Sequence, residues 1–565
     1  MFSKTDLKRW FPFLQWPRPN AALLRGEIAA GITVALVMVP QSVAYAGLAG
    51  MPLITGLYAA LLPALVAVLF SGSTRLSVGP SALSCLLVGA SLSGLAEPGS
   101  AQWVSLAVWL AILTGLVQFT LGAGTYGWVL NLVSSPVLTA FSQAAALLII
   151  ASQLPALIGL NGPLTSLLNA PPLDLAALAF GVGSVGALVL GKRYLPRVPM
   201  VMLVVAGSAL IAKFTGYSVQ GAIIGPLPAG LPSPYWPGLP TWDTFGALVA
   251  PALVLALVTS LETAASAKIE AQHDGKRWND NQDLIGQGLG KLVSAFSGSF
   301  ATSTSFSRSA ITLYAGARTG WSTIAATFFV VLTLLFLTPA LYHVPRAVLS
   351  AVVVAAVAGL LKPRALLNLW QVNRVEAVTA LVTFGVTLLT APRIYWGVLT
   401  GVLMSLSHFL HHRLHPRIIE VGLHPDGSLR DRHLWHLPPL APNLYALRMD
   451  AELDFASASG FERAIVEHLA AHPQIRDVCL FAQPINRIDA TGVEIFDQVR
   501  RLLAARDITL HISGIKLPVE KVLQRAGAFG PSPLLRTYRT DTEALGVLQA
   551  PQGACDAAQS RPAPA

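Results

Sequence analysis

Long apolar segments separated by short polar connections dominate the first 412 residues of the chain. A membrane-spanning helix needs about 20 mostly apolar residues, and by that measure this part holds about fourteen segments. They begin near Glu27, Thr55, Val78, Gln102, Ser135, Leu173, Pro199, Thr244, Gln282, Ser305, Trp321, Arg346, Glu376 and Ile394. The fourteen segments divide into two halves of seven. Because each half crosses the membrane an odd number of times, the second half is inverted relative to the first. The pattern therefore predicts an all-α membrane domain of 7+7 inverted repeats.

The third segment of each half is short and interrupted. In the first half, Gly79 and Pro80 precede a short apolar run, and in the second a Ser/Thr-rich run precedes a short helix. Such half-helices place N-terminal amides and positive dipole ends inside the membrane, where they favour an anion. We expect an anion site there, with hydroxyl donors from Ser81 and Ser307 and a positive charge from Arg308.

Two intramembrane charges carry alternative interpretations. Arg308 could instead pair with Glu262 or extend to the interface, with the hydroxyls only capping helices. Glu262 lies in an apolar run, where a buried carboxylate is costly unless it is paired or protonated. It is therefore a candidate cation-coupling residue for a proton or sodium ion. The alternative is a fixed salt bridge to Arg308 or Lys291.

Composition supports a membrane protein, since 53% of the residues are hydrophobic and only 12% are charged. The net charge of +10 is spread thinly between apolar segments, which excludes a nucleic-acid-binding face. Basic residues are concentrated in alternate loops, and only Arg346 and Arg393 lie on the outer side. This distribution predicts a multi-pass protein of the cell (inner) membrane with cytoplasmic N- and C-termini. No catalytic motif or metal site is predicted, and the histidines of 408–415 are interpreted as an interfacial helix exit.

The last third changes to short strands and amphipathic helices, typical of a small cytoplasmic α/β domain with a mostly parallel sheet. The expected organisation is an N-terminal arm, a transport domain, a linker, the α/β domain and a disordered tail. These parts cover residues 1–26, 27–412, 413–442, 443–549 and 550–565.

Two stretches resemble the sulfate permease (SulP) family of anion transporters, which includes prestin. Residues 39–83 resemble its Pro-Gln, Ala-Tyr-Ala, Gly-Leu-Tyr and Ser-Val-Gly-Pro signature, and residues 260–311 resemble its Asn-Gln-Asp-Leu and Ser-Phe-Ser-Arg-Ser segments. The chain departs from the family at Thr55, where Tyr or Phe is usual, and at residues 301–304, where Pro-Val-Thr-Gly is usual.

This resemblance implies a core domain (spans one to four and eight to eleven) that moves against a gate domain, with the anion between half-helices 3 and 10. It also places Gln41 and Tyr45 near the anion. Gln41 follows the helix-interrupting Pro40, and Tyr45 lies one turn later on the same face. A helix-kink partner and simple packing are the alternatives for Gln41 and Tyr45.

Residues 488–492 resemble the Asp-Ser-Ser-Gly turn of STAS domains, which follow the membrane domain in this family. Thr491 stands at the position that is phosphorylated in the related anti-sigma-factor antagonists. A phosphate there would gain from a helix N-terminus, but Asp489 and Thr491 could equally form only a helix cap. The resemblance also implies a homodimer and a cytoplasmic regulatory partner at the STAS-like domain.

The sequence therefore predicts a secondary active transporter of small inorganic anions, not an enzyme, with sulfate or bicarbonate as the leading substrates. No cofactor is expected beyond a coupling proton or sodium ion. Chloride, nitrate and C4-dicarboxylates are alternative substrates. An anion channel or a non-transporting anion sensor is the alternative function, and a nucleobase permease is disfavoured by the Ser-Phe-Ser-Arg-Ser helix.

Overall fold

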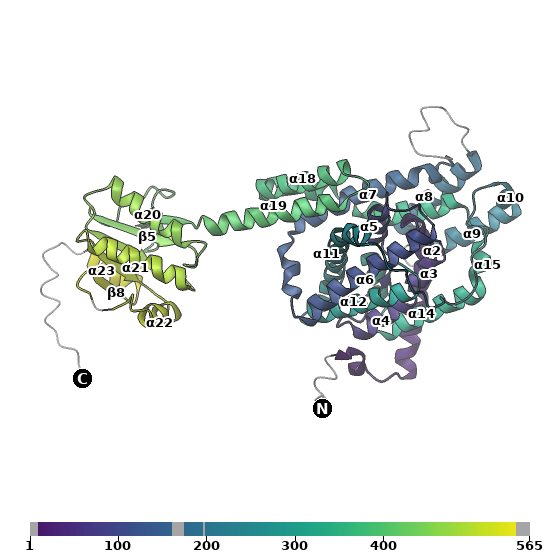
Figure 1. Ribbon diagram of the computed structural model, residues 1–565, viewed down its shortest axis with the longest axis horizontal. Helices are drawn as coiled ribbons and strands as arrows, with labels where there is room; N and C mark the ends of the chain where they lie inside the picture. The colour runs from purple at the N-terminus through teal and green to yellow at the C-terminus, as the bar shows by residue number, and fades with distance from the viewer. Residues whose placement is uncertain (1–9, 161–173, 196–197, 531, 550–565) are drawn as a thin grey trace. The chain divides into compact units, whose positions relative to one another are not determined.

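The computed structural model describes residues 10–160, 174–195, 198–530 and 532–549, which form two compact units (Figure 1). Unit 1, Met1–Leu406, is helical and carries the apolar segments, and unit 2, Ser407–Ala565, is an α/β domain. The expected disordered tail, 550–565, and the first residues of the N-terminal arm lie outside the described residues.

Helices occupy all the segments predicted in the first half of unit 1. They are α2 (Ala21–Leu48), α3 (Thr55–Ala59), α4 (Leu62–Phe70), α5 (Ala82–Leu92), α6 (Ala101–Ala123), α7 (Ser135–Leu157), α8 (Leu175–Tyr194) and α9 (Met200–Phe214). The first helix begins at Ala21 rather than near Glu27, because the Asn20 side chain accepts a hydrogen bond from Leu23 N (2.8 Å) and caps it. The expected start of the sixth span, Leu173, lies outside the described residues.

Helices also occupy the segments of the second half. They are α11 (Trp242–His273), α12 (Asp280–Phe296), α13 (Phe306–Tyr314), α14 (Trp321–Leu332), η4 (Thr333–Leu337), α15 (Thr338–Leu341), α16 (Arg346–Val357), α18 (Arg374–Leu389) and α19 (Tyr395–Leu414). Connecting helices are η1 (Pro12–Gln15), η2 (Gly127–Leu132), α10 (Tyr217–Gln220), η5 (Ala358–Leu360) and α17 (Pro363–Val372). Among the described residues, seven helical segments are both long and apolar enough to cross a membrane, and three shorter ones are apolar.

The most extensive helix packing in unit 1 falls into two sets, and α16 connects them by packing against α2 as well. In one group α12 packs against α6 and α4, and α14 packs against α2. In the other α7 packs against α16 and α18, and α16 packs against α8. The short helix α5 lies within the bundle and contacts α2, α6 and α11, so the first half-helix is enclosed by longer ones (Figure 1).

Small residues bring α6 and α12 into close contact. A Cβ atom built on Gly288 would lie 2.6 Å from Phe119 N, and one on Gly115 would lie 2.9 Å from Gly288 O. Only hydrogen atoms fit at these positions, and so the two backbones touch. Close packing through small residues is a common way to hold helices together inside a bilayer, where burial of apolar surface provides little attraction between helices.

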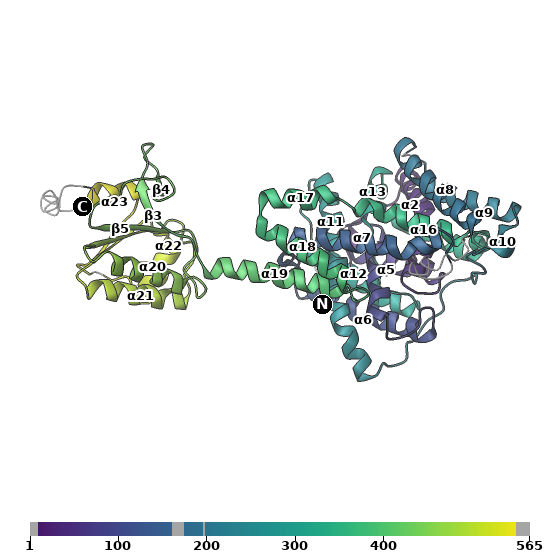
Figure 2. The ribbon, with the colours of Figure 1, turned by 90° about the horizontal axis from the view of Figure 1, so that it is seen from above.

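Unit 2 contains a six-stranded sheet in the order β4-β3-β5-β6-β7-β8. Its elements are β3 (Ile418–Leu423), β4 (Leu429–Asp431), β5 (Leu444–Met449), α20 (Ala458–Ala471), β6 (Asp477–Phe481), α21 (Ala490–Ala504), β7 (Thr509–Ser513), α22 (Leu517–Arg525), β8 (Leu535–Tyr538) and α23 (Asp541–Leu548). Strands β5 to β8 are parallel, whereas β3 and β4 pair antiparallel. Helices α20, α21 and α22 cover one face of the sheet and α23 covers the other (Figure 2).

The segment expected to be a linker, 413–442, contributes two strands to this sheet. Ile418 pairs with Met449 and Glu420 with Leu447, so β3 lies directly beside β5. The sheet therefore begins before residue 443. Val421 is buried among side chains of β5 and β6, and this burial explains why the segment is ordered as a strand.

Candidate functional site

The two interrupted segments cross each other at the centre of unit 1. Strand β1 (Val78–Gly79) pairs antiparallel with β2 (Ser303–Thr304), with Val78 opposite Thr304. Beyond the strands, Ser305 N donates to Ser77 O (3.0 Å). Helix α5 begins just after β1 and α13 just after β2, so the crossing brings both helix N-termini together.

Local sequence explains why the chain turns from strand to helix at α5. Gly79 has φ +157°, a backbone conformation that residues with a Cβ rarely adopt. Pro80 follows, and Ser81 caps α5 by accepting a hydrogen bond from Ser84 N (3.2 Å). Ser84 Oγ in turn accepts from Ser81 N (3.2 Å), which completes a capping box. The N-terminus of α5 is thus fixed by its own side chains.

Arg308 lies at this crossing and is fully buried. Its Nε donates to Ser77 Oγ (3.2 Å) and its Nη2 donates to the carbonyl of Pro80 (2.9 Å). Its Nη1 donates to Gln41 Oε1 (3.4 Å) on α2. The guanidinium therefore connects three segments, and these bonds use three of its five N–H donors. Arg308 does not extend toward an interface.

Glu262, on α11, bridges both interrupted segments. Its Oε2 accepts hydrogen bonds from Ser81 Oγ (3.0 Å) and from Ser303 Oγ (2.5 Å). Among the described residues it forms no ion pair within 4 Å with Arg308 or Lys291. The fixed salt bridge considered from the sequence is therefore absent, and hydroxyl groups hold the carboxylate instead.

The structure gathers most of the predicted site residues. Gln41 and Tyr45 are buried on one face of α2, and Tyr45 lies within electrostatic range of Arg308 and Glu262. Ser307 differs: it is exposed, and its hydroxyl lies 3.4 Å from Ser305 Oγ.

Sequence reasoning missed Ser77 and Ser303 as members of this cluster. Each lies beside a predicted half-helix, and Ser303 belongs to the Ser/Thr-rich run that the sequence pattern identified. Their roles depend on the pairing of β1 with β2, which joins segments more than 200 residues apart. The positions of the hydroxyls were visible in the sequence, but their partners were not.

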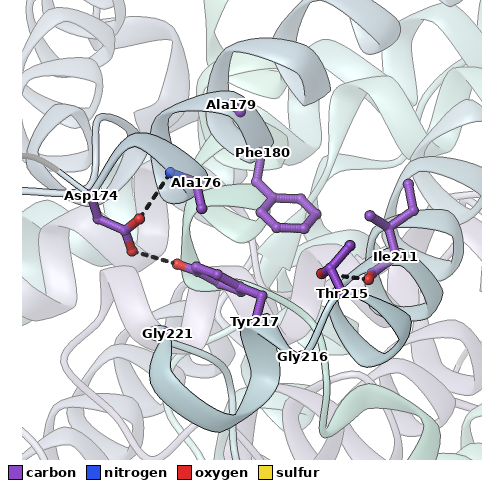
Figure 3. Close-up of a pocket in the computed structure, with 9 residues that line it drawn as sticks. All are labelled: Asp174, Ala176, Ala179, Phe180, Ile211, Thr215, Gly216, Tyr217 and Gly221. Carbon is purple, nitrogen blue, oxygen red and sulfur yellow. Dashed lines mark hydrogen bonds between the residues drawn. The ribbon is translucent and has the colours of Figure 1, made fainter.

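A cavity of about 790 Å³ lies away from this cluster, at the ends of α8 and α9 (Figure 3). Tyr217 donates its hydroxyl to Asp174 Oδ2 (3.0 Å), and Asp174 Oδ1 accepts from Ala176 N (2.9 Å). None of the predicted site residues lines this cavity. Asp174 is the one charged side chain among the described residues of its lining, and a carboxylate repels anions, so the cavity does not suit the predicted substrate.

The histidines near the end of α19 stack in pairs. The rings of His408 and His412 have centroids 4.4 Å apart, and those of His411 and His415 are 4.3 Å apart. In the described part of the chain, no group of three or more His, Cys, Asp or Glu side chains could hold a metal ion.

In unit 2, Asp489 caps α21, the helix that carries Thr491. Its Oδ1 accepts from Gly492 N (2.8 Å) and its Oδ2 from Phe455 N (3.0 Å). Burial acts to raise the pKa of the Asp489 carboxyl, but these backbone donors outweigh it and hold the pKa below its usual value. Thr491 is exposed at the start of the helix. The cap that the sequence suggested is therefore present, with Thr491 beside it.

Comparisons with known proteins place both units in described families. The sequence model of the sulfate permease family matches residues 24–383, and that of the STAS domain matches residues 439–544. Sulfate transporter 4.1, chloroplastic, of Arabidopsis thaliana is 28% identical over 92% of this chain and 79% of its own length. A probable sulfate transporter of Mycobacterium tuberculosis is 28% identical over 95% of this chain and 98% of its own.

Solved structures agree with this fold. SLC26A9 superposes with a TM-score of 0.87 at 20% identity and covers 99% of this chain and 95% of its own. The transmembrane domain of the cyanobacterial bicarbonate transporter BicA superposes with a TM-score of 0.60 at 18% identity, over 69% of this chain and 99% of its own. The chain therefore belongs to the sulfate permease family, and it is a multi-pass membrane anion transporter with a C-terminal STAS domain, not an enzyme.

Proposed function

We propose that this chain is a secondary active transporter of a small inorganic anion, with sulfate or bicarbonate as the leading substrate, and that it works by alternating access. The observation that carries the proposal is the fully buried Arg308 at the meeting point of α5 and α13. A buried guanidinium without a carboxylate in contact is costly, and an anionic substrate would offset that cost.

The anion would lie between the two half-helices, close to Arg308. Two N–H groups of the guanidinium remain after its three hydrogen bonds, and the first amides of α5 and α13 add partial positive charge. Gln41 accepts a hydrogen bond from Nη1, and the buried Tyr45 is the second proposed site residue on α2. Ser81 and Ser307 are the proposed hydroxyl contacts.

Glu262 is the proposed coupling residue. Protonation would remove the negative charge that accepts hydrogen bonds from Ser81 and Ser303, and so would free the Ser81 hydroxyl to turn toward an anion. Cation binding and anion binding would then favour each other through one shared serine. Either a proton or a sodium ion satisfies this scheme.

The names of the relatives and the chemistry of the site bear on the substrate. The relatives from Arabidopsis thaliana and Mycobacterium tuberculosis are named as sulfate transporters, and BicA is named as a bicarbonate transporter. Backbone amides and one Arg recognise charge more than chemical identity, so chloride, nitrate and C4-dicarboxylates remain alternatives.

Substitution of Arg308 tests the proposed site. A charge-assisted contact is worth about 1.5 to 3 kcal/mol, so Arg308→Ala should weaken anion affinity about ten- to a hundredfold. Arg308→Lys keeps the charge without the planar fork and should restore only part of the affinity. Affinity is measured by calorimetry on purified protein with sulfate and with bicarbonate.

The matched control is Arg346→Ala, which removes an exposed arginine of unit 1. It should bind as the wild type does. Folded Arg308→Ala with wild-type affinity for every bound anion would refute the site. A transporter should show saturable, concentrative uptake in sealed vesicles. A channel would give an ohmic current instead, and a sensor would give neither uptake nor current.

Regulation through unit 2 is a second part of the proposal. Thr491 is exposed at the N-terminus of α21, where a phosphate would meet the positive end of the helix dipole. A cytoplasmic partner would read that modification. Mass spectrometry of protein purified from its native cells tests this idea, and an unmodified Thr491 in growing and starved cells would count against it.

The family membership also leads us to propose a homodimer in the cell membrane with both termini in the cytoplasm. The distribution of basic residues between alternate loops supports this orientation. Protease digestion of sealed cells and of inverted vesicles tests it, because unit 2 should be cut only in the inverted vesicles.

A further inference from the structure

The connection between α4 and β1 is held by two buried carboxylates from the second half of unit 1. Asp283 Oδ1, on α12, accepts a hydrogen bond from Ser73 N (2.9 Å), and its Oδ2 accepts one from Ser73 Oγ (2.6 Å). Glu270 Oε1, on α11, accepts from Thr74 N (3.1 Å) and from Arg75 N (3.3 Å). Three successive backbone amides therefore bind carboxylates from elements that come much later in the chain.

Arg75 extends this contact along α11. Its Nε forms an ion pair with Glu270 Oε1 (3.2 Å), and its Nη2 forms one with Asp274 Oδ1 (2.7 Å). An uncompensated buried carboxylate is costly, and the amide and guanidinium donors offset that cost at Glu270. Asp274 differs from Glu270 because it is partly exposed and contacts the connection through the Arg75 side chain.

The connection before β2 is held in another way. Ser299 Oγ donates to Ser294 O (2.9 Å), and Ser297 Oγ donates to the same carbonyl (2.8 Å). These groups are neutral, and they lie close together in the sequence. A connection that leads into one of the paired strands can therefore be closed by local hydroxyl groups. Closing a turn does not by itself account for the two carboxylates before β1.

The α4–β1 connection leads directly to groups that hold the proposed site together. Ser77 Oγ accepts from Arg308 Nε (3.2 Å), and Ser81 Oγ donates to Glu262 Oε2 (3.0 Å). Helix α11 therefore contacts this part of the chain at two points, through Glu270 before β1 and through Glu262 after it. The two carboxylates are about two helical turns apart, so one rigid helix holds both ends of the segment.

We infer that Glu270 and Asp283 are positioning residues of the anion site. They fix the α4–β1 connection against α11 and α12, and so the residues that follow meet Arg308 and Glu262 in one register. A slip by one residue would turn the Ser77 hydroxyl away from Arg308, because successive side chains of an extended segment point in opposite directions. This inference rests on the proposed function, because it takes the Arg308 cluster as the anion site.

A double-mutant cycle on the full-length protein tests this inference. Calorimetry with sulfate and with bicarbonate measures the anion affinity of the wild type, Glu270→Gln, Ser77→Ala and the double variant. Ser77→Ala removes the hydroxyl that accepts from Arg308 and leaves the backbone bond from Ser305 N to Ser77 O.

Glu270→Gln should weaken anion affinity in the wild-type background. If Glu270 acts by placing Ser77, the same substitution should weaken affinity less when the Ser77 hydroxyl is already absent. The two effects should then depart from simple multiplication by a factor of about 2 to 100, as is usual for directly linked residues. A purely structural role would lower the unfolding temperature and leave the two effects multiplicative.

Asp274→Asn is the matched control. It removes a carboxylate that pairs with Arg75, but it leaves the bonds from Glu270 to the backbone of the connection. This variant should bind anions as the wild type does. An equal loss of affinity in Asp274→Asn would mean that the charge around Arg75 matters rather than the position of the connection, and it would overturn the inference. Multiplicative effects of Glu270→Gln and Ser77→Ala would overturn it as well.

Ser73→Ala keeps the test decisive if Glu270→Gln fails to fold. It removes one hydroxyl bond to Asp283 and leaves the bond from Ser73 N, so it loosens the same connection more gently. Its cycle with Ser77→Ala has the same two outcomes, and multiplicative effects would again overturn the inference. A wild type that binds none of the proposed anions would instead refute the proposed function.

Discussion

Glu262 shows how one residue connects the parts of the proposed site. Its carboxylate accepts from Ser81, which caps α5, and from Ser303 in β2. Glu262→Gln keeps the size of the side chain and one oxygen that can accept a hydrogen bond, but it removes the negative charge. An amide is not protonated in the pH range in which a carboxylate is. We expect anion exchange to persist and pH-gradient-driven accumulation to be lost, because the coupling step requires a titratable group.

Uptake by proteoliposomes with and without an inward proton gradient measures this effect. Glu97→Gln, at an exposed carboxylate of unit 1, is the control and should accumulate anion normally. If Glu262→Gln still responds fully to the gradient, the coupling role is wrong. A lower unfolding temperature with unchanged coupling would assign Glu262 a structural role only.

At the scale of elements, the contact between α6 and α12 depends on glycine. In Gly288→Ala the new methyl group would lie 2.6 Å from Phe119 N, a backbone atom that cannot turn aside. The helices must separate, and overpacking of this kind costs about 1 to 3 kcal/mol. We therefore expect a lower midpoint of thermal unfolding in detergent, measured by tryptophan fluorescence.

Gly207→Ala on α9 is the comparison, since nothing lies within 4 Å of the added methyl group. Alanine is the better helix former, so this variant should unfold at or slightly above the wild-type temperature. Equal midpoints for Gly288→Ala and the wild type would contradict the close packing of α6 with α12.

For the whole molecule, the two compact units suggest where the chain can be divided. All proposed anion-binding and coupling residues lie in unit 1, so a chain that ends at Leu414, the last residue of α19, should bind anions as the full chain does. A chain that ends at Leu440 keeps β3 and β4 without their partner β5. Unpaired strand edges promote aggregation, so this second truncation should be the less soluble.

Size-exclusion chromatography and sulfate calorimetry on both truncations check this prediction. Loss of binding in a correctly inserted chain ending at Leu414 would mean that unit 2 contributes to the site. Equal solubility of the two chains would contradict the assignment of β3 and β4 to the sheet of unit 2.

The sequence by itself determined the elements, because hydrophobic length, proline, glycine and caps act locally. The expected spans correspond to helices, and the interruptions at Gly79 and before Phe306 correspond to β1 and β2. The predicted strands and helices of unit 2 formed as β5, β6, β7, α20 and α21. Arg308 and Glu262 could be selected because a charge in an apolar run is costly wherever it lies.

Only the tertiary structure decided the partners of these residues. Arg308 bonds to Gln41 from 267 positions earlier, and Glu262 bonds to Ser81 from 181 positions earlier. Such pairs depend on how β1 and β2 cross, and no local preference encodes a crossing. The tertiary structure also decided that Ser307 is exposed, because the spacing of hydrophobic residues does not indicate this. It decided that residues 418–423 form the strand β3 as well, because β5 offers an open edge to pair with.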